Sequence, residues 1–120
     1  MAGTLQVYSY NRCSTCRKAL AWLSERGIAH EVHDITLNPP SRELLSAAHQ
    51  ALGERKMLFN TSGQSYRAMG AAAVKALSDN AALDALAADG KLIKRPFVAV
   101  DSSTFLVGFK PDLWESALQG

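Results

Sequence analysis

The chain has 120 residues, of which 48% are hydrophobic and 20% charged, and its net charge is +2. This length suits one domain spanning residues 1–120 that buries a core without disulfides, and it excludes a multidomain organisation. The small net charge gives no sign of a nucleic-acid surface, and neither a secretory signal nor a run of ~20 apolar residues occurs. We therefore expect a cytoplasmic monomer without direct nucleic-acid or membrane contact.

The first predicted elements are a strand and a helix. Residues 4–10 alternate apolar and polar side chains and include β-branched and aromatic residues, which predicts a strand. From Cys16 onward apolar residues recur with the i, i+3, i+4, i+7 spacing of one helical face, and Gly27 is the expected end of this helix. The strand therefore delivers Cys13 to the N-terminus of a helix.

The sequence Cys13-Ser14-Thr15-Cys16 is the candidate reactive site. Free N–H groups of a first helical turn stabilise negative charge, and Arg12, Arg17 and Lys18 lie beside the thiol in the sequence. We expect the pKa of Cys13 to lie one to several units below the ~8.5 of a free thiol, which makes it a nucleophile at neutral pH. Cys16 lies one turn deeper, where a resolving thiol is placed.

Two other interpretations of the cysteine pair stay open. The pair could be half of a zinc site completed by His30 and His33, or it could be structural and inert. Residues 29–35 are predicted to form a strand, however, and residues three apart on a strand point to opposite faces. A redox role is favoured, because a strand, a C-x-x-C and a helix in this order are typical of thioredoxin-like motifs. We expect no metal.

The middle of the chain is predicted to be helical. The polar composition of the strand at 29–35 suggests a sheet edge. Helices then follow, interrupted by a polar loop at 60–65 between two short helical pieces, and together they form an all-helical insertion at about residues 41–89. The longer predicted helices are 41–52, capped by Ser41 and ended by Gly53, and 71–77 and 80–88, separated by Ser78 and Asp79.

The C-terminal part is predicted to be a hairpin and a helix. Residues 97–100 and 104–107 are short apolar runs joined by a polar turn. Pro111 suits the first turn of a last helix, whose predicted inward residues are Leu113, Trp114, Ala117 and Leu118. The order β-α-β, helices, β-β-α predicts an α/β fold with a thioredoxin-like arrangement.

Three separated segments resemble the glutaredoxin-like arsenate reductase and Spx family. They are residues 10–19 around the C-x-x-C, residues 60–67 with the sequence Asn-Thr-Ser-Gly-Gln-Ser-Tyr-Arg, and residues 93–96 together with Gly108 and Phe109. The likeness runs across nearly the whole chain, including the helical insertion. It implies a thioredoxin/glutaredoxin-like core.

The resemblance also implies roles for individual residues. Cys13 matches the reactive cysteine of the family, and Arg95 matches the arginine beside an active-site proline, Pro96, which is expected to be cis. A cis X-Pro bond would present the backbone of Arg95 to an extended thiol substrate, and the guanidinium would donate to an oxyanion or carboxylate. The predicted substrate-binding residues are Arg12, Asn60, Arg95 and Pro96.

The chain departs from the arsenate reductases of this family, which resemble one another in using three arginines. Asn60 and Phe109 stand where the second and third are expected, and an amide and an aromatic ring should weaken arsenate binding. Lys110 and Arg67 are two cations that could compensate for the missing guanidiniums. The second cysteine, Cys16, resembles the Spx-like members, whose C-x-x-C acts as a redox switch.

We therefore expect a thiol–disulfide oxidoreductase in which Cys13 attacks and Cys16 resolves. Its substrates would be glutathione mixed disulfides or arsenate, and its reductant would be glutathione or thioredoxin, or another protein thiol donor, with no bound cofactor. The alternative is an Spx-like redox-sensing regulator that binds the α subunit of RNA polymerase through Gly53 and the inserted helices.

Overall fold

A four-stranded mixed sheet organises the first and last thirds of the chain. In the computed structural model, which describes residues 3–118, the strand order is β2-β1-β3-β4. The central strand β1 (Leu5–Ser9) pairs in parallel with β2 (His30–Asp34) and antiparallel with β3 (Phe97–Ala99), and β3 pairs antiparallel with β4 (Phe105–Val107). The predicted thioredoxin-like arrangement is confirmed, and β2 lies at the edge as its polarity predicts.

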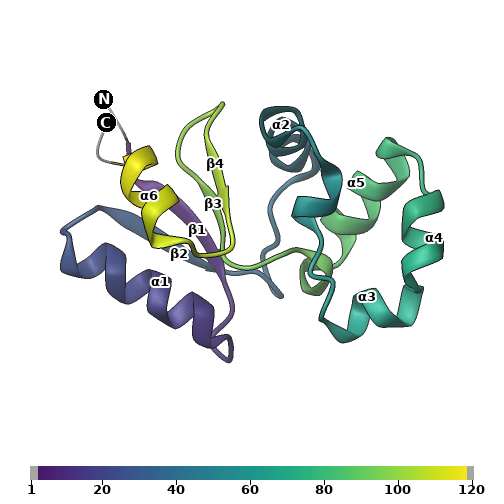
Figure 1. The fold of residues 1–120 in the computed structure, drawn as a ribbon, viewed down its shortest axis with the longest axis horizontal. Helices are drawn as coiled ribbons and strands as arrows, with labels where there is room; N and C mark the ends of the chain where they lie inside the picture. The colour runs from purple at the N-terminus through teal and green to yellow at the C-terminus, as the bar shows by residue number, and fades with distance from the viewer. Residues whose placement is uncertain (1–2, 119–120) are drawn as a thin grey trace.

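The sheet is covered on both faces. Leu5 and Val7 alternate with partly exposed residues along β1, and they pack with Val98 against α1 (Ser14–Glu25) and α6 (Pro111–Leu118). The neighbours of Val98 on β3 face the opposite way and join a larger core that includes residues of the helical insertion. In Figure 1 the sheet accordingly stands between α1 and α6 on one side and the inserted helices on the other.

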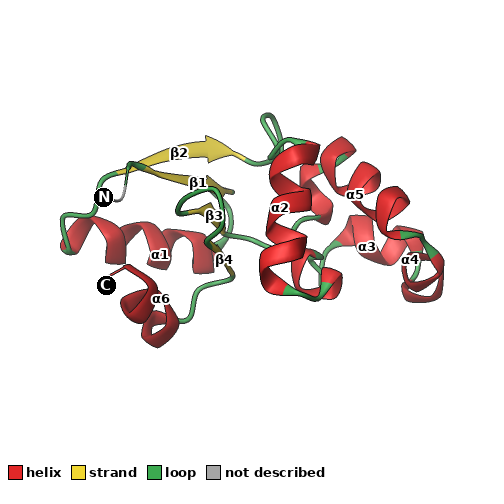
Figure 2. Cartoon of the chain, turned by 90° about the horizontal axis from the view of Figure 1, so that it is seen from above, coloured by secondary structure: helices red, strands yellow, loops and turns green. Residues whose placement is uncertain are grey.

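The helical segment, residues 42–92, lies between β2 and β3. It contains α2 (Arg42–Leu52), η1 (Arg55–Leu58), α3 (Gln64–Met69), α4 (Ala71–Ala76), α5 (Asp79–Ala88) and η2 (Gly90–Leu92), and Figure 2 shows it beside the sheet. Ser41 and Ser78 cap α2 and α5 as predicted, each accepting a backbone N–H at 3.1 Å. The polar loop is shorter than predicted, because α3 already begins at Gln64. None of the helices in the described residues has the length and apolar character needed to span a membrane.

A short backbone pairing joins the helical segment to the sheet. Phe59 and Ile93 form an isolated antiparallel bridge. The N–H of Asn60 donates to the carbonyl of Leu92 and the N–H of Lys94 to the carbonyl of Leu58, both at 2.7 Å. The loop that carries Asn60 and the segment that leads into β3 are therefore held side by side.

The prediction for the last helix is wrong in part. Leu113 is 58% exposed and Ala117 is also exposed, whereas Trp114 is buried. The indole of Trp114 fills the space that the helix offers to the sheet, because it packs edge-on against Trp22 and Phe109 and its Nε1–H donates to the carbonyl of Gly108 at 3.1 Å. A helix of 8 residues held by one large ring buries a narrower stripe than its apolar pattern suggests.

Candidate active site

Cys13 occupies the N-cap of α1. Its backbone is extended, with φ −94° and ψ 114°, and its Sγ accepts the backbone N–H of Cys16 at 3.3 Å. The helix begins at Ser14, closer to the first thiol than the apolar pattern alone indicates. Cys13 is half-buried and Cys16 is 1% exposed, so one sulfur reaches the surface and the other lies beneath it.

The two thiols have opposite pKa shifts. Partial burial raises the pKa of Cys13, but hydrogen bonds from the side chain and N–H of Cys16, the charge of Arg95 and the N–H of Thr15 together outweigh it, and the pKa is lowered. Burial, with a smaller contribution from Cys13, raises the pKa of Cys16 to about 12. As the pH rises, Cys13 is thus the first of the two thiols to ionise, while Cys16 stays protonated and available as a hydrogen-bond donor.

Arg95 and Pro96 lie at the start of β3, next to the thiol. The Arg95–Pro96 peptide bond is cis, as expected from the family resemblance. Pro96 is buried, and its carbonyl accepts the N–H of Gly108 at 2.9 Å. The guanidinium of Arg95 lies over the ring of Tyr10, 4.9 Å from its centroid, and within residues 3–118 it has no carboxylate at ion-pair distance. Its charge is therefore available to Cys13 and to a ligand.

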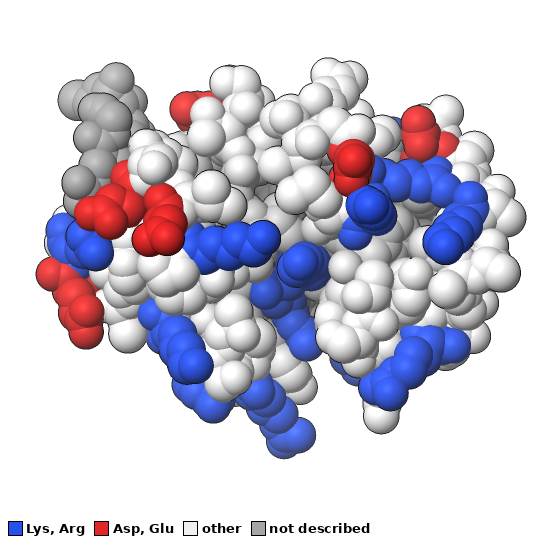
Figure 3. All heavy atoms as spheres, in the orientation of Figure 1, with Lys and Arg blue, Asp and Glu red and all other residues white. Residues whose placement is uncertain are grey.

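A cleft of about 350 Å³ opens above Cys13, and we call it the Cys13 cleft. It brings together three of the predicted site residues, Cys13, Asn60 and Arg95. Two further cations, Lys94 and Lys110, line it as well. Figure 3 shows basic side chains gathered at the hollow between the sheet and the helical segment. The cleft is therefore suited to a ligand that carries negative charge.

Asn60 is held in place by its loop. Its backbone is tied to Leu92, and its Oδ1 accepts the hydroxyl hydrogen of Ser62 at 3.3 Å. Its amide lies against Gly63, where a Cβ would come within 2.6 Å of Nδ2. Gly63 therefore leaves the room that the Asn60 side chain occupies, and the helical segment supplies an amide to a cleft whose thiol comes from the sheet.

Three of the predicted site residues do not line this cleft: Cys16, Pro96 and Arg12. Cys16 and Pro96 are buried, next to Cys13 and Arg95 respectively, whereas Arg12 is exposed in the turn before α1. Sequence reasoning also missed residues that do line the space around Arg95, notably Tyr10 and Lys91. The basic run Lys91-Leu92-Ile93-Lys94-Arg95 was the available signal, because three cations directly precede the expected active-site proline.

The two histidines considered as zinc ligands have local partners. His30 Nδ1 donates to the carbonyl of Ile28 at 2.7 Å, and His33 Nε2 donates to the side-chain oxygen of Gln6 at 2.6 Å. The ring of His33 also stacks on Tyr8, with centroids 4.7 Å apart. In the part of the chain that the structure describes, no three His, Cys, Asp or Glu side chains come together as metal ligands.

The comparison with known protein families agrees with this geometry. A family model described as the ArsC family matches residues 8–117, which include the thiols, the helical segment and the Arg95–Pro96 segment. The chain belongs to the ArsC family.

Individual relatives within and around the ArsC family include enzymes by name and a regulator. A crystal structure titled a possible arsenate reductase from Streptococcus mutans UA159 superposes with a TM-score of 0.84 at 40% identity, covering 92% of this chain and 97% of that one. The uncharacterized protein YusI of Bacillus subtilis is 43% identical over 93% of this chain and 96% of its own length. The global transcriptional regulator Spx of Streptococcus agalactiae is 29% identical over 83% of this chain and 72% of its own length.

Proposed function

We propose that this ArsC-family protein is a thiol–disulfide oxidoreductase with Cys13 as nucleophile and Cys16 as resolving thiol. The observation that carries the proposal is that one environment shifts the pKa values of two thiols, three residues apart, in opposite directions. The pKa of Cys13 is lowered and that of Cys16 is raised to about 12, although each sulfur faces the other. This asymmetry supports attack by the half-buried thiol, with the buried one held protonated until the second exchange.

The proposed cycle consists of two exchanges. The Cys13 thiolate attacks a substrate disulfide R–S–S–R′, forms a Cys13–S–S–R bond and expels R′–S⁻, which takes a proton from water. Cys16 then loses its proton and attacks the sulfur of Cys13, so that R–S⁻ leaves and an internal disulfide forms. Two electrons have passed from the protein to the substrate. A glutathione pair or a dithiol protein such as thioredoxin would return them.

The cations around the cleft support the first exchange. Arg95 lowers the pKa of Cys13 by its charge, and its remaining donors face the cleft. Asn60, held by its turn, offers an amide at the same opening. In the proposed mechanism these two side chains orient the substrate, while the N–H of Cys16 stabilises the thiolate.

The proposal is tested by the pH dependence of alkylation and by turnover. We expect iodoacetamide to modify one thiol with a midpoint below the ~8.5 of a free cysteine, and Cys13→Ser to remove this reaction. Disulfide reduction should fall by a factor of about 10³ or more in Cys13→Ser, while Cys16→Ser should form the mixed disulfide and accumulate it. A Cys13 that titrates as an ordinary thiol, or turnover that survives Cys13→Ser, would contradict the proposal.

Arsenate is a second candidate substrate, favoured by the cations of the cleft. Lys94, Arg95 and Lys110 all line the cavity that contains Cys13, so two lysines share the cleft with Asn60 and Phe109, which stand where the family resemblance implies arginines. A lysine binds an oxyanion as a point charge and lacks the paired donors of a guanidinium. We expect weak arsenate-dependent oxidation of a thiol donor that Cys13→Ser abolishes, and no such oxidation would remove this substrate.

A redox-sensing regulator is the alternative from another class, favoured by the likeness to Spx. In this proposal the Cys13–Cys16 pair would change the affinity for the α subunit of RNA polymerase. The exposed end of α2 at Gly53 would be part of the contact surface. Retention of the α subunit that differs between the reduced and oxidised chain would support it, and no retention in either state would remove it.

A further inference from the structure

A second cavity adjoins the Cys13 cleft. It measures about 240 Å³, and we call it the Lys91 chamber. Asn60 and Arg95 line both spaces, so a ligand anchored in the chamber passes these two side chains on its way to the thiol. The other residues that line the chamber are Tyr10, Gly63, Gln64, Ser65 and Lys91.

The chamber presents positive charge without a counter-charge. Lys91 and Arg95 both line it, and none of its lining residues in the described part of the chain is acidic. The nearby carboxylate of Asp89 accepts the backbone N–H of Lys91 at 2.9 Å. Neither cation forms an ion pair with another described residue. An anionic group that enters the chamber therefore meets two positive charges that are not already neutralised.

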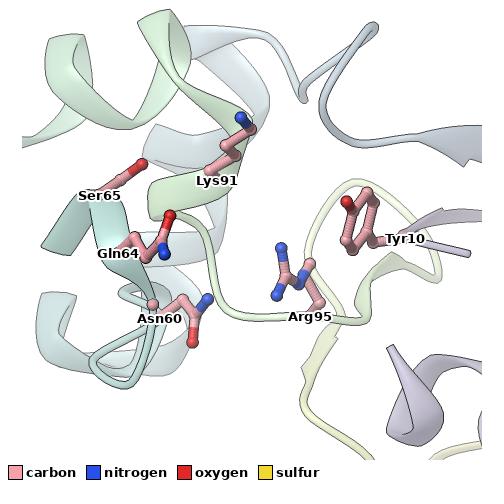
Figure 4. A pocket seen from close by; sticks show the side chains of 7 residues that line it. Tyr10, Asn60, Gln64, Ser65, Lys91 and Arg95 are labelled. Carbon is pink, nitrogen blue, oxygen red and sulfur yellow. The ribbon is translucent and has the colours of Figure 1, made fainter. Parts of the chain in front are cut away.

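The remaining polar groups favour a planar anion. Figure 4 shows the amides of Asn60 and Gln64 and the guanidinium of Arg95 turned toward one space, with Lys91 at its rim. A guanidinium presents paired N–H donors that match the two oxygens of a carboxylate, and side-chain amides add single donors. The ring of Tyr10 closes the side behind Arg95 and fixes the position of its charge.

We infer that the Lys91 chamber binds the carboxylate end of a small thiol-bearing molecule whose sulfur reaches Cys13. The inference rests on the proposed disulfide exchange and names its substrate class: low-molecular-weight disulfides that carry a free carboxylate. The exchange itself is unchanged, with R as the carboxylated half. The two cavities lie near or below the lower end of the ~300–1,000 Å³ range of small-molecule pockets, which fits a peptide-sized ligand.

The test compares glutathione disulfide with its carboxyl ethyl ester, which has the same skeleton but masked carboxylates. We expect kcat/KM to be higher for the acid than for the ester. Lys91→Gln should lower kcat/KM for the acid by roughly three- to tenfold, because one charged donor is lost, and should leave the ester within about twofold. Lys56→Gln is the matched control: it removes an exposed lysine outside both cavities and should preserve the preference.

A binding measurement separates this inference from the proposed function. S-methylglutathione, which cannot undergo exchange, is titrated into Cys13→Ser and followed by the backbone amide signals of Gln64, Ser65 and Lys91. We expect these signals to shift, and the dissociation constant to rise roughly three- to tenfold when Lys91→Gln is added. This measurement tests carboxylate binding in the Lys91 chamber even if the protein reduces no disulfide.

Four outcomes would overturn the inference while leaving the oxidoreductase proposal intact. The ester could be reduced as well as the acid, Lys91→Gln could behave like Lys56→Gln, or S-methylglutathione could leave the chamber signals unmoved. Displacement of S-methylglutathione by millimolar inorganic phosphate but not by acetate would also overturn it, since it would identify a phosphoryl site. If neither disulfide is reduced but S-methylglutathione binds in a Lys91-dependent way, the proposed function fails and the carboxylate site stands.

Discussion

The sheet part of the molecule, β1–β4 with α1 and α6, and the helical segment contribute different things to one site. In the proposed function the sheet part supplies reactivity, because Cys13 caps α1 and Arg95 precedes β3. The helical segment would supply recognition, because Asn60, Gln64 and Lys91 all come from it and carry no nucleophile. A thioredoxin-like core alone would hold the thiols at an open surface. The inserted helices turn that surface into two adjoining cavities.

The two parts must therefore be held in a fixed relative position, and we call the contacts between them that do so the joint. The pairing of residues 58–60 with 92–94 and the contact of Gly90 with Ile35 hold the recognition residues against the reactive ones. If the two parts divide the work in this way, a change at the joint should disturb both the reactivity of Cys13 and the recognition of the substrate. A change within the sheet part should alter reactivity without altering the preference for carboxylates.

The largest effect is expected at the joint, from Gly90→Ala. Gly90 is buried, and a Cβ there would overlap the backbone carbonyl of Ile35 at the end of β2. Because a backbone cannot move aside as a flexible side chain does, we expect a loss of about 2–3 kcal/mol in the free energy of unfolding. Urea denaturation measures it, and the variant should also lose part of its preference for the acid form of glutathione disulfide, since Lys91 follows Gly90 directly.

The control is Gly3→Ala, because a Cβ at Gly3 has nothing within 4 Å and the stability should stay within about 0.5 kcal/mol. Trp22 and Trp114 both lie in the sheet part, so tryptophan fluorescence follows that part, while far-UV circular dichroism is dominated by helices. Coincident transitions would show that the two parts unfold as one unit. An unchanged midpoint in Gly90→Ala would contradict the role of this joint.

The next effect concerns the buried thiol of the sheet part. Folding raises the pKa of Cys16 from about 9, the value of an unburied thiol, to about 12. The folded state therefore holds the thiol proton more tightly than the unfolded state does. Its stabilising contribution is complete below the unfolded pKa and is lost as pH rises toward the folded pKa. Between pH 9 and 10.5, reduced protein should therefore lose about 1–2 kcal/mol more stability than Cys16→Ala.

Two other groups bear on this comparison. The raised pKa of Tyr8 acts in both proteins and cancels. The pKa of Cys13 is lowered by folding, so its contribution is complete only above the unfolded pKa, and it is smaller in Cys16→Ala because the Cys16 side chain helps to lower that pKa. Parallel stability curves for wild type and Cys16→Ala would show that the burial of Cys16 does not control its protonation. Activity toward the ester and the acid should fall equally in this variant.

The sheet part and the two longest inserted helices were predictable from the sequence to within a few residues. Alternation in residues 4–10, the C-x-x-C before an amphipathic run and the caps Ser41 and Ser78 are local signals, and the structure confirms each of them. The final helix was predicted less well, because the burial of Leu113 depends on how much of the sheet remains free once the Trp114 ring is in place. Local periodicity does not contain that information.

The site was predictable in the Cys13 cleft but not in the Lys91 chamber. Cys13, Asn60 and Arg95 meet in one cleft, as the family resemblance led us to expect, although their roles as catalytic and binding residues stay predictions. The chamber was not foreseen, because Tyr10 and Lys91 are 81 positions apart and meet only through the joint. Lys91 lies in a basic run of the kind that is usual on a solvated surface. The sequence does not show that its buried neighbour, Gly90, places Lys91 beside the chamber.

The smallest effect is expected at the contact between Tyr10 and Arg95. The ring of Tyr10 lies under the guanidinium of Arg95, which lowers the pKa of Cys13 and also lines the Lys91 chamber. A cation–π contact of this kind contributes about 0.5–1 kcal/mol. We therefore expect Tyr10→Leu to raise the pKa of Cys13 by up to about half a pH unit, as measured by alkylation rates. The acid-over-ester preference should fall roughly two- to fivefold.

Tyr10→Phe is the matched variant, since it keeps the ring and removes only the hydroxyl. It should preserve both the pKa of Cys13 and the substrate preference within about twofold if the contact acts through the π face. Equal losses in Tyr10→Phe and Tyr10→Leu would instead assign the effect to the hydroxyl, as a direct hydrogen bond to the carboxylate. A Tyr10→Leu protein could instead lose its preference for the acid and keep the wild-type pKa of Cys13. That result would separate the two roles of Arg95, because it would show that the guanidinium lowers the pKa of the thiol without the Tyr10 ring and needs the ring only to bind the carboxylate.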